Sequence, residues 1–212
     1  MNELRYIVIE GVIGVGKTSL AEILAPRLQG QLVLEHPEEN PFLENFYDDP
    51  RRYAFQTQLF FLLSRYRQQQ ELPQLDFFRP ILVADYLFAK DKIFAYINLS
   101  KAELLLYERL MEILEPRIRK PDLVIYLQSS TERLMQNIRL RNRPYESSMT
   151  EDYIRTLNEA YNQFFLNYNE TPLLIVNSTR LDFVKNQEDL ESLAREIMRE
   201  HTGRAFYNPM EK

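Results

Sequence analysis

The 212-residue sequence contains no cysteine, which excludes both a disulfide framework and a zinc–thiolate site. It contains only 5 glycines, and 45% of its residues are hydrophobic, which argues against a disordered or fibrous protein. No apolar run approaches the ~20 residues that a membrane-spanning helix needs. The chain opens on a strand-like run and not on a signal peptide, so we expect a cytoplasmic protein with no membrane partner.

Positive charge is also scarce. The formal net charge is −5 and the pI is about 5.3, whereas a general nucleic-acid-binding protein needs a basic surface. We therefore expect no nucleic-acid partner. The length fits one large domain, which we predict to span residues 1–203, with a helix ending at Gly203 and a loose C-terminal tail over 204–212.

Short runs of Val, Ile and Leu recur between helical segments. Because these runs are apolar on both faces, they are typical of parallel strands covered by helices. Their alternation with helices predicts an α/β fold of three layers with a five-stranded parallel sheet. The five runs are residues 6–9, 32–34, 81–84, 123–127 and 173–176.

The stretch IVIEGVIGVGKTSL follows this pattern of strand, glycine-rich loop and helix. It contains a complete P-loop, whose backbone N–H groups and helix N-terminus hold the phosphates of a nucleoside triphosphate. Lys17 should reach the β- and γ-phosphates, and the Thr18 hydroxyl should bind Mg²⁺. The residues expected to contact the nucleotide are Gly11, Gly14, Val15, Gly16, Lys17, Thr18 and Ser19.

Two acidic residues follow predicted strands. Glu35 comes after the second apolar run and Asp85 after the third, at the edge where open α/β sheets bind ligands. Phosphoryl transfer needs a metal ligand and a proton acceptor, and these two acids could supply them.

The predicted helix over 51–71 is apolar nearly all round, yet Gln58 and Arg65 lie on one stripe of it. Buried polar groups need partners. These two side chains could bond other core groups, or they could face a cleft and bind a planar polar ligand.

The stretch NIRLRNRPYE contains Arg139, Arg141 and Arg143. A charge run is usually a solvated face, but P-loop kinases close an arginine-bearing lid over the transferring phosphoryl group. We expect such a lid at about residues 138–148.

From Ile7 to about Phe183, these motifs resemble the deoxynucleoside kinase family, and most closely its bacterial deoxyguanosine and deoxyadenosine kinases. The resemblance implies a homodimeric enzyme that transfers the γ-phosphoryl group of ATP to the 5′-hydroxyl of a deoxynucleoside, with a purine preferred.

The resemblance also implies roles for residues around the acceptor. Glu35 in LVLEHP matches the general base that acts on the 5′-hydroxyl, and Tyr47 in NPFLENFY matches the tyrosine that holds the 3′-hydroxyl. Gln58 and Arg65 match the residues beside the base, which favours the cleft over the core for this pair. Asp85 matches an acid that assists Mg²⁺.

At the phosphate and sugar ends, Arg141 and Arg143 match lid arginines, and Glu146 matches a lid acid near the 3′ side of the sugar. Asp182 and Phe183 resemble the segment that flanks the adenine of ATP. In the animal and other bacterial members an arginine follows the position of Asp85, whereas this chain has Tyr86, as ADY also reads in the deoxyguanosine kinase branch.

Two other functions fit parts of the sequence. A thymidylate-type nucleoside monophosphate kinase shares the P-loop, the sheet and the lid, but typically carries Asp-Arg where this chain has Asp85-Tyr86. A nucleotide-dependent regulatory module would not need an arginine-rich lid.

Overall fold

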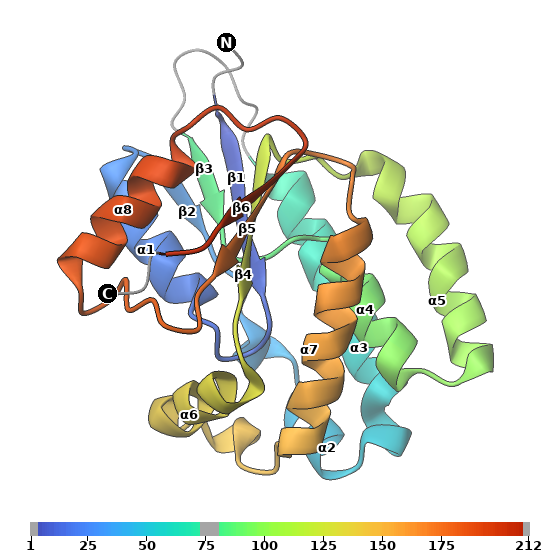
Figure 1. The fold of residues 1–212 in the computed structure, drawn as a ribbon. Coiled ribbons are helices and arrows are strands. Elements are labelled where there is room, and N and C mark those ends of the chain that lie inside the picture. The colour runs from blue at the N-terminus through green and yellow to red at the C-terminus, as the bar shows by residue number, and fades with distance from the viewer. Residues whose placement is uncertain (1–3, 73–80, 210–212) are drawn as a thin grey trace.

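A computed structural model describes residues 4–72 and 81–209 of the chain. It has three layers, with a parallel sheet between two sets of helices (Figure 1). The helices are α1 (Lys17–Arg27), α2 (Leu43–Asp48), α3 (Pro50–Glu71), α4 (Lys90–Asn98), α5 (Lys101–Leu114), α6 (Thr131–Arg141), α7 (Glu151–Asn167) and α8 (Gln187–Ile197), with 3-10 turns at Pro37–Glu39, Glu115–Arg117 and Pro144–Glu146.

The sheet has the strand order β2-β3-β1-β4-β5-β6, and all its pairings are parallel. Its strands are β1 (Tyr6–Gly11), β2 (Gln31–Val33), β3 (Leu82–Ala84), β4 (Leu123–Gln128), β5 (Leu173–Asn177) and β6 (Arg204–Tyr207). Each of the five apolar runs overlaps one of β1 to β5, which confirms the predicted parallel sheet.

The prediction of five strands and of a loose tail from residue 204 was wrong. Residues 204–207 form β6, which pairs with β5 from Leu173↔Arg204 to Val176↔Tyr207. The last helix, α8, ends at Ile197, before Gly203. Side chains of β6 alternate between exposed and partly buried, so this edge strand lacks the continuous apolar run of the others. Residues 210–212 of the predicted tail lie outside the described part of the chain.

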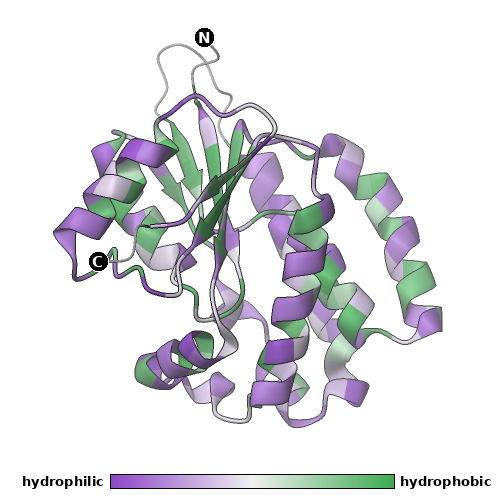
Figure 2. Cartoon of the chain, in the orientation of Figure 1, coloured by the Kyte–Doolittle hydropathy of each residue, from purple (hydrophilic) through white to green (hydrophobic). Residues whose placement is uncertain are grey.

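Hydrophobic residues concentrate in the strands of the sheet (Figure 2), and buried residues of the strands and of the helices around them form the main core. Helices α1 and α8 lie on one side of the sheet, while α3, α4 and α7 lie on the other with α5 outside them (Figure 1). Tyr126 of β4 stacks on Phe165 of α7 with ring centroids 4.2 Å apart. This contact packs α7 against β4.

Helix α5 begins as its sequence predicts. The Ser100 side chain accepts a hydrogen bond from the backbone of Glu103, and the Glu103 carboxylate accepts one from the Ser100 backbone, forming a capping box. The helix ends at Leu114, and Pro116 lies in the 3-10 turn that follows. Within the described residues, no helix is long and apolar enough to cross a lipid bilayer.

Candidate active site

Three strands deliver polar segments to one edge of the sheet. The glycine-rich loop leaves β1, and Glu35 and Asp85 follow β2 and β3. Strand β1 lies between β3 and β4, so the chain connections diverge at its carboxyl end, where open α/β sheets bind ligands. The fold therefore brings the loop and both acids together.

The loop has the backbone conformation that its glycines allow. Gly14 and Gly16 have φ of 87° and 100°, in the left-handed region that favours glycine. A Cβ on Gly16 would lie 3.0 Å from the Phe183 ring, so that ring packs directly against the loop. Helix α1 begins at Lys17, and its first N–H groups are available to a phosphate.

Lys17 folds along the loop, with Nζ donating to the carbonyl oxygens of Gly11 at 2.7 Å and of Val12 at 3.4 Å. Burial lowers the pKa of the Lys17 ammonium to about 8, while the nearby Glu10 carboxylate opposes that shift. Glu10 therefore helps to keep Lys17 cationic.

Thr18 and Asp85 form a pair that fits a magnesium site. The Thr18 hydroxyl donates to Asp85 Oδ2 at 2.6 Å, and Asp85 Oδ1 accepts from the Glu35 backbone N–H at 2.8 Å. No group of three or more His, Cys, Asp or Glu residues that could hold a metal occurs in the described ranges. The Thr18 hydroxyl and the Asp85 carboxylate are oxygen groups of the kind that Mg²⁺ takes, usually one or two from the protein together with phosphates and water.

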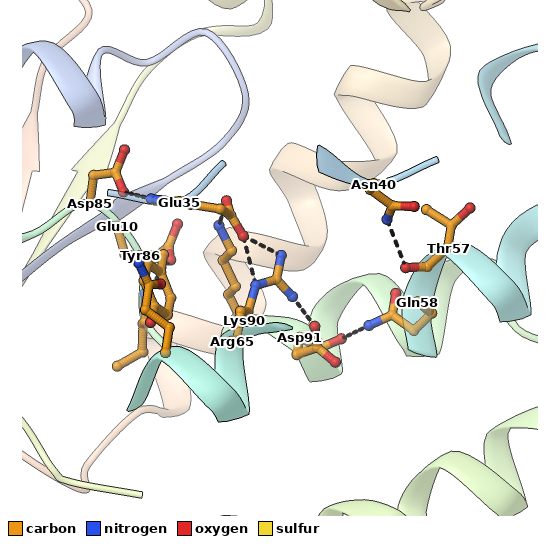
Figure 3. Close-up of polar contacts among 12 residues, drawn as sticks. Glu10, Glu35, Asn40, Thr57, Gln58, Arg65, Asp85, Tyr86, Lys90 and Asp91 are labelled. Carbon is orange, nitrogen blue, oxygen red and sulfur yellow. Dashed lines mark hydrogen bonds and ion pairs between the residues drawn. The ribbon is translucent and has the colours of Figure 1, made fainter. Parts of the chain in front are cut away.

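Glu35 lies between two cations (Figure 3). Its Oε1 accepts from Arg65 Nε at 2.7 Å and lies 2.6 Å from Arg65 Nη2, and its Oε2 accepts from Lys90 Nζ at 2.6 Å. Burial alone would raise the pKa of Glu35, but the charges of Arg65 and Lys90 together lower it well below its usual range. The carboxylate is therefore ionised at neutral pH.

Arg65 and Gln58 have partners on α4 as well. Arg65 Nη1 donates to Asp91 Oδ1, and Gln58 Nε2 donates to the Asp91 backbone oxygen at 2.9 Å. Both side chains are buried and both line a cavity. Gln58 and Arg65 thus combine the two interpretations of the sequence, because they bond other core groups and also face a cavity.

This cavity has a volume of about 340 Å³ and lies between the strand ends, α3, α4 and the lid. Tyrosine and phenylalanine rings contribute to its walls, which suits a planar ligand. It contains every residue predicted to bind the acceptor or to act on it, namely Lys17, Thr18, Glu35, Tyr47, Gln58, Arg65, Asp85, Arg141, Arg143 and Glu146.

The predicted lid spans the end of α6 and the turn Pro144–Glu146. Arg141 donates through Nε to Glu146 Oε2 at 3.2 Å and pairs through Nη2 with Oε1. Arg143 Nη1 donates to the Tyr145 hydroxyl at 2.7 Å. Burial raises the pKa of Tyr47, and the nearby Glu146 carboxylate adds to that shift, so Tyr47 keeps its hydroxyl proton.

A second cavity of about 590 Å³ adjoins the first and shares the P-loop and the lid arginines with it. It is lined by Gly14, Val15, Gly16 and Ser19 of the loop and by Asp182 and Phe183. Asp182 Oδ1 also accepts from the Lys185 backbone N–H at 3.0 Å, so this side chain stabilises its own turn. Among the predicted nucleotide-contacting residues, Gly11 alone lines neither cavity. It is the last residue of β1, and its carbonyl oxygen accepts a hydrogen bond from Lys17.

Sequence reasoning missed three buried charged residues around the site. Lys90 and Asp91 open α4 and hold Glu35 and Arg65. Glu10 accepts from the backbone N–H groups of Gly11 and Leu87, each at 2.8 Å, and so ties the P-loop to the segment before α4. The available signal was a pair of charges, Lys90 and Asp91, at the start of a short helix that is otherwise largely apolar.

Tyr86, which stands where animal and some bacterial members carry an arginine, does not line the 340 Å³ cavity. It is fully buried, and its hydroxyl accepts from Gln69 Nε2 at 3.2 Å. Lys90 Nζ lies 5.8 Å from the centre of its ring.

A phosphate-binding loop, an acid at the adjoining strand end and a neighbouring cavity lined by the arginines of the predicted lid are typical of a P-loop phosphotransferase. The model of the deoxynucleoside kinase family matches residues 7–202. The chain belongs to this family, which confirms the resemblance seen in its sequence.

Individual relatives agree. The chain is 34% identical to a deoxyguanosine kinase of Bacillus subtilis over 203 residues, covering 93% of this chain and 98% of that one. It is also 34% identical to a deoxyadenosine kinase of Dictyostelium discoideum, covering 97% and 83%. A solved deoxyadenosine kinase of M. mycoides with bound dATP superposes with a TM-score of 0.80 at 25% identity, covering 93% of this chain and 100% of that one.

Proposed function

We propose that this kinase transfers the γ-phosphoryl group of ATP to the 5′-hydroxyl of a purine deoxynucleoside, for deoxynucleotide salvage. The observation that carries the proposal is the ionised Glu35 carboxylate, which lines the same 340 Å³ cavity as Lys17 and Thr18 of the P-loop. A neutral hydroxyl bound there must lose its proton as the new P–O bond forms, and a carboxylate can accept it.

In the donor half, we assign ATP to the 590 Å³ cavity, with its adenine near Asp182 and Phe183 and its phosphates on the P-loop. Thr18 and Asp85 would hold Mg²⁺, which shields the phosphate charges when bound. Lys17, Arg141 and Arg143 line both cavities, so they can stabilise the phosphoryl group as it passes between them.

In the acceptor half, Gln58 and Arg65 are assigned to the base, and Tyr47 and Glu146 to the 3′ side of the sugar. An amide offers both a donor and an acceptor to the edge of a base. The purine assignment is supported by the names of three relatives, which are deoxyguanosine or deoxyadenosine kinases.

Charge pairing argues against a nucleotide acceptor. A monophosphate brings a dianion, and the two cations that lie against Glu35 are already paired, Lys90 with Glu35 and Arg65 with Glu35 and Asp91. The ionised Glu35 would repel that dianion.

An ATP-consumption assay tests the proposal. Purified protein with Mg²⁺ is offered each of the four deoxynucleosides, each of their 5′-monophosphates, or no acceptor, with Lys17→Ala as the inactive control. We expect turnover with deoxyguanosine or deoxyadenosine well above that with any monophosphate. Better turnover of a monophosphate would overturn the assignment of the acceptor.

We also propose that the enzyme is a homodimer located in the cytoplasm. Support for the dimer comes from the resemblance and from large apolar side chains exposed on α4 and α5, among them Tyr96, Leu105 and Ile113. Light scattering should give twice the 25.4 kDa chain mass, and a monomer at micromolar concentration would contradict the proposal.

A further inference from the structure

Lys90 is an unusual residue for the place it occupies. Its side chain is only 4% exposed, although lysine is among the residues least often buried. It is the first residue of α4, where the positive end of the helix dipole disfavours a cation. A lysine in such a position needs a strong anionic partner.

The partner of Lys90 is the acid to which the proposed function assigns the proton of the acceptor. Nζ lies 2.6 Å from Glu35 Oε2, while Arg65 holds the other oxygen, Oε1 (Figure 3). Lys90 lines the acceptor cavity. In the proposed binding mode, only the Glu35 carboxylate therefore separates Lys90 from the acceptor oxygen. Lys90 is also close enough to the P-loop for its charge to act on Lys17.

The charge balance of the transfer then predicts what happens at Lys90. The acceptor oxygen forms a bond to the γ-phosphorus, the bond from that phosphorus to the β–γ bridging oxygen breaks, and ADP leaves with the bonding electrons. The acceptor proton passes to Glu35, which becomes neutral. Lys90 keeps its own protons and loses its anionic partner, whereas Arg65 still has Asp91.

The only new anion beside Glu35 is the phosphoryl group on the oxygen that Glu35 had contacted. We propose that Lys90 is a catalytic residue that moves its hydrogen bond from Glu35 to this phosphoryl group as it is transferred. Tyr86 cannot make this contact, since it is buried outside the cavity and its hydroxyl accepts a hydrogen bond from Gln69. This inference rests on the proposed function.

The test is made in a Glu35→Gln background, in which Lys90 no longer has a carboxylate to neutralise. Any effect of Lys90 that remains must then come from another contact. Glu35→Gln, Glu35→Gln/Lys90→Met and Glu35→Gln/Lys90→Arg are compared by calorimetric binding of deoxyguanosine, deoxyadenosine and their 5′-monophosphates. Against Glu35→Gln, the Lys90→Met double variant should bind the monophosphate about tenfold or more weakly, because a charge-assisted hydrogen bond is lost. Nucleoside binding should change less than about threefold, and Lys90→Arg should restore most of the monophosphate affinity.

Lys92→Met in the same background is the matched control. Lys92 lies on the same helix but pairs with Glu115 at 2.6 Å and lines neither cavity, so monophosphate affinity should not change. If Lys90→Met unfolds the protein, Lys90→Gln gives the same comparison.

Equal monophosphate affinity with and without Lys90 would overturn the role of Lys90, and so would equal losses for nucleoside and monophosphate. The wild type is assayed in parallel with both nucleosides. Absence of nucleoside turnover by the wild type would refute the proposed function itself, which keeps the two failures distinct.

Discussion

At the scale of single residues, the carboxylate of Glu35 is held more tightly than a free proton acceptor would be. Two cations bind it, and they lower its pKa far enough to keep it ionised throughout the physiological range. A low pKa makes a carboxylate a weaker base. As the proton acceptor that we propose, Glu35 would therefore suit a transition state in which proton transfer is late and positioning dominates.

Replacing Glu35 with Gln should lower kcat by roughly 10²–10⁴-fold with little change in the KM of either substrate. It should also lower thermal stability, because Lys90 loses its anionic partner and Arg65 loses one of two. Activity is therefore measured per folded enzyme. Glu39→Gln, an exposed acid four residues on, should leave kcat unchanged. Full turnover by Glu35→Gln would show that another group accepts the proton.

Gln58→Ala should raise KM for the deoxynucleoside much more than KM for ATP, since truncating a hydrogen-bonding partner typically costs ~1–3 kcal/mol. Steady-state kinetics with each substrate varied in turn measure the difference. Gln56→Ala is the matched control, because Gln56 is exposed on the same helix. Loss of stability with unchanged KM would mean that Gln58 only supports Asp91.

At the scale of elements, the predicted lid is a short turn whose side chains contact one another. Arg141 pairs with Glu146 and Arg143 with Tyr145, and the Ser148 hydroxyl donates to Asp48 at the end of α2 at 2.7 Å. These contacts bring arginines to the boundary of the two cavities while anchoring the turn at its far end.

Arg143→Gln should reduce kcat by roughly a hundredfold or more, because it removes a cation that lines both cavities, between which we propose that the phosphoryl group passes. Binding of the deoxynucleoside alone should change little, which calorimetry without ATP can measure. Arg139→Gln offers a control on the same lid helix, since Arg139 is exposed and lines neither the acceptor nor the donor cavity. A similar loss in both variants would indicate a general effect of lid charge.

At the scale of the whole molecule, β6 makes the last described segment part of the fold. It completes the sheet beside β5, and the Tyr207 hydroxyl donates to Ser192 of α8 at 2.8 Å. The strand therefore supports the layer that carries α8, far from the acceptor cavity.

Deletion of residues 204–212 should lower Tm by at least about 4 °C, because β5 becomes an unpaired edge and α8 loses a contact. Phe206→Ser is the control, since the Phe206 side chain is 63% exposed and should tolerate the change. Thermal unfolding followed by circular dichroism measures both. An unchanged Tm after the deletion would mean that β6 adds nothing to stability.

The sequence by itself determined those parts of the protein whose signal is local. The P-loop is contiguous, and its glycines and lysine carry their chemistry in their order. Buried strands can be recognised in the sequence as apolar runs. Because parallel strands end at a common edge of the sheet, Glu35 and Asp85 could be predicted to lie near each other. The family and the class of reaction could therefore be predicted and are confirmed.

Only the tertiary structure decided the partners of the buried charges. Lys90 and Glu35 are 55 residues apart in the sequence, and Arg65 and Asp91 are 26 apart. No rule of sequence spacing links such positions, because the packing of α3 and α4 against the sheet edge brings the side chains of each pair together. The same holds for β6, whose pairing with β5 is long-range while its own four residues have half their side chains exposed. The role of a buried charged residue can be assigned only when its partner is known. That partner lies on an element distant in sequence, which only the folded structure brings into contact.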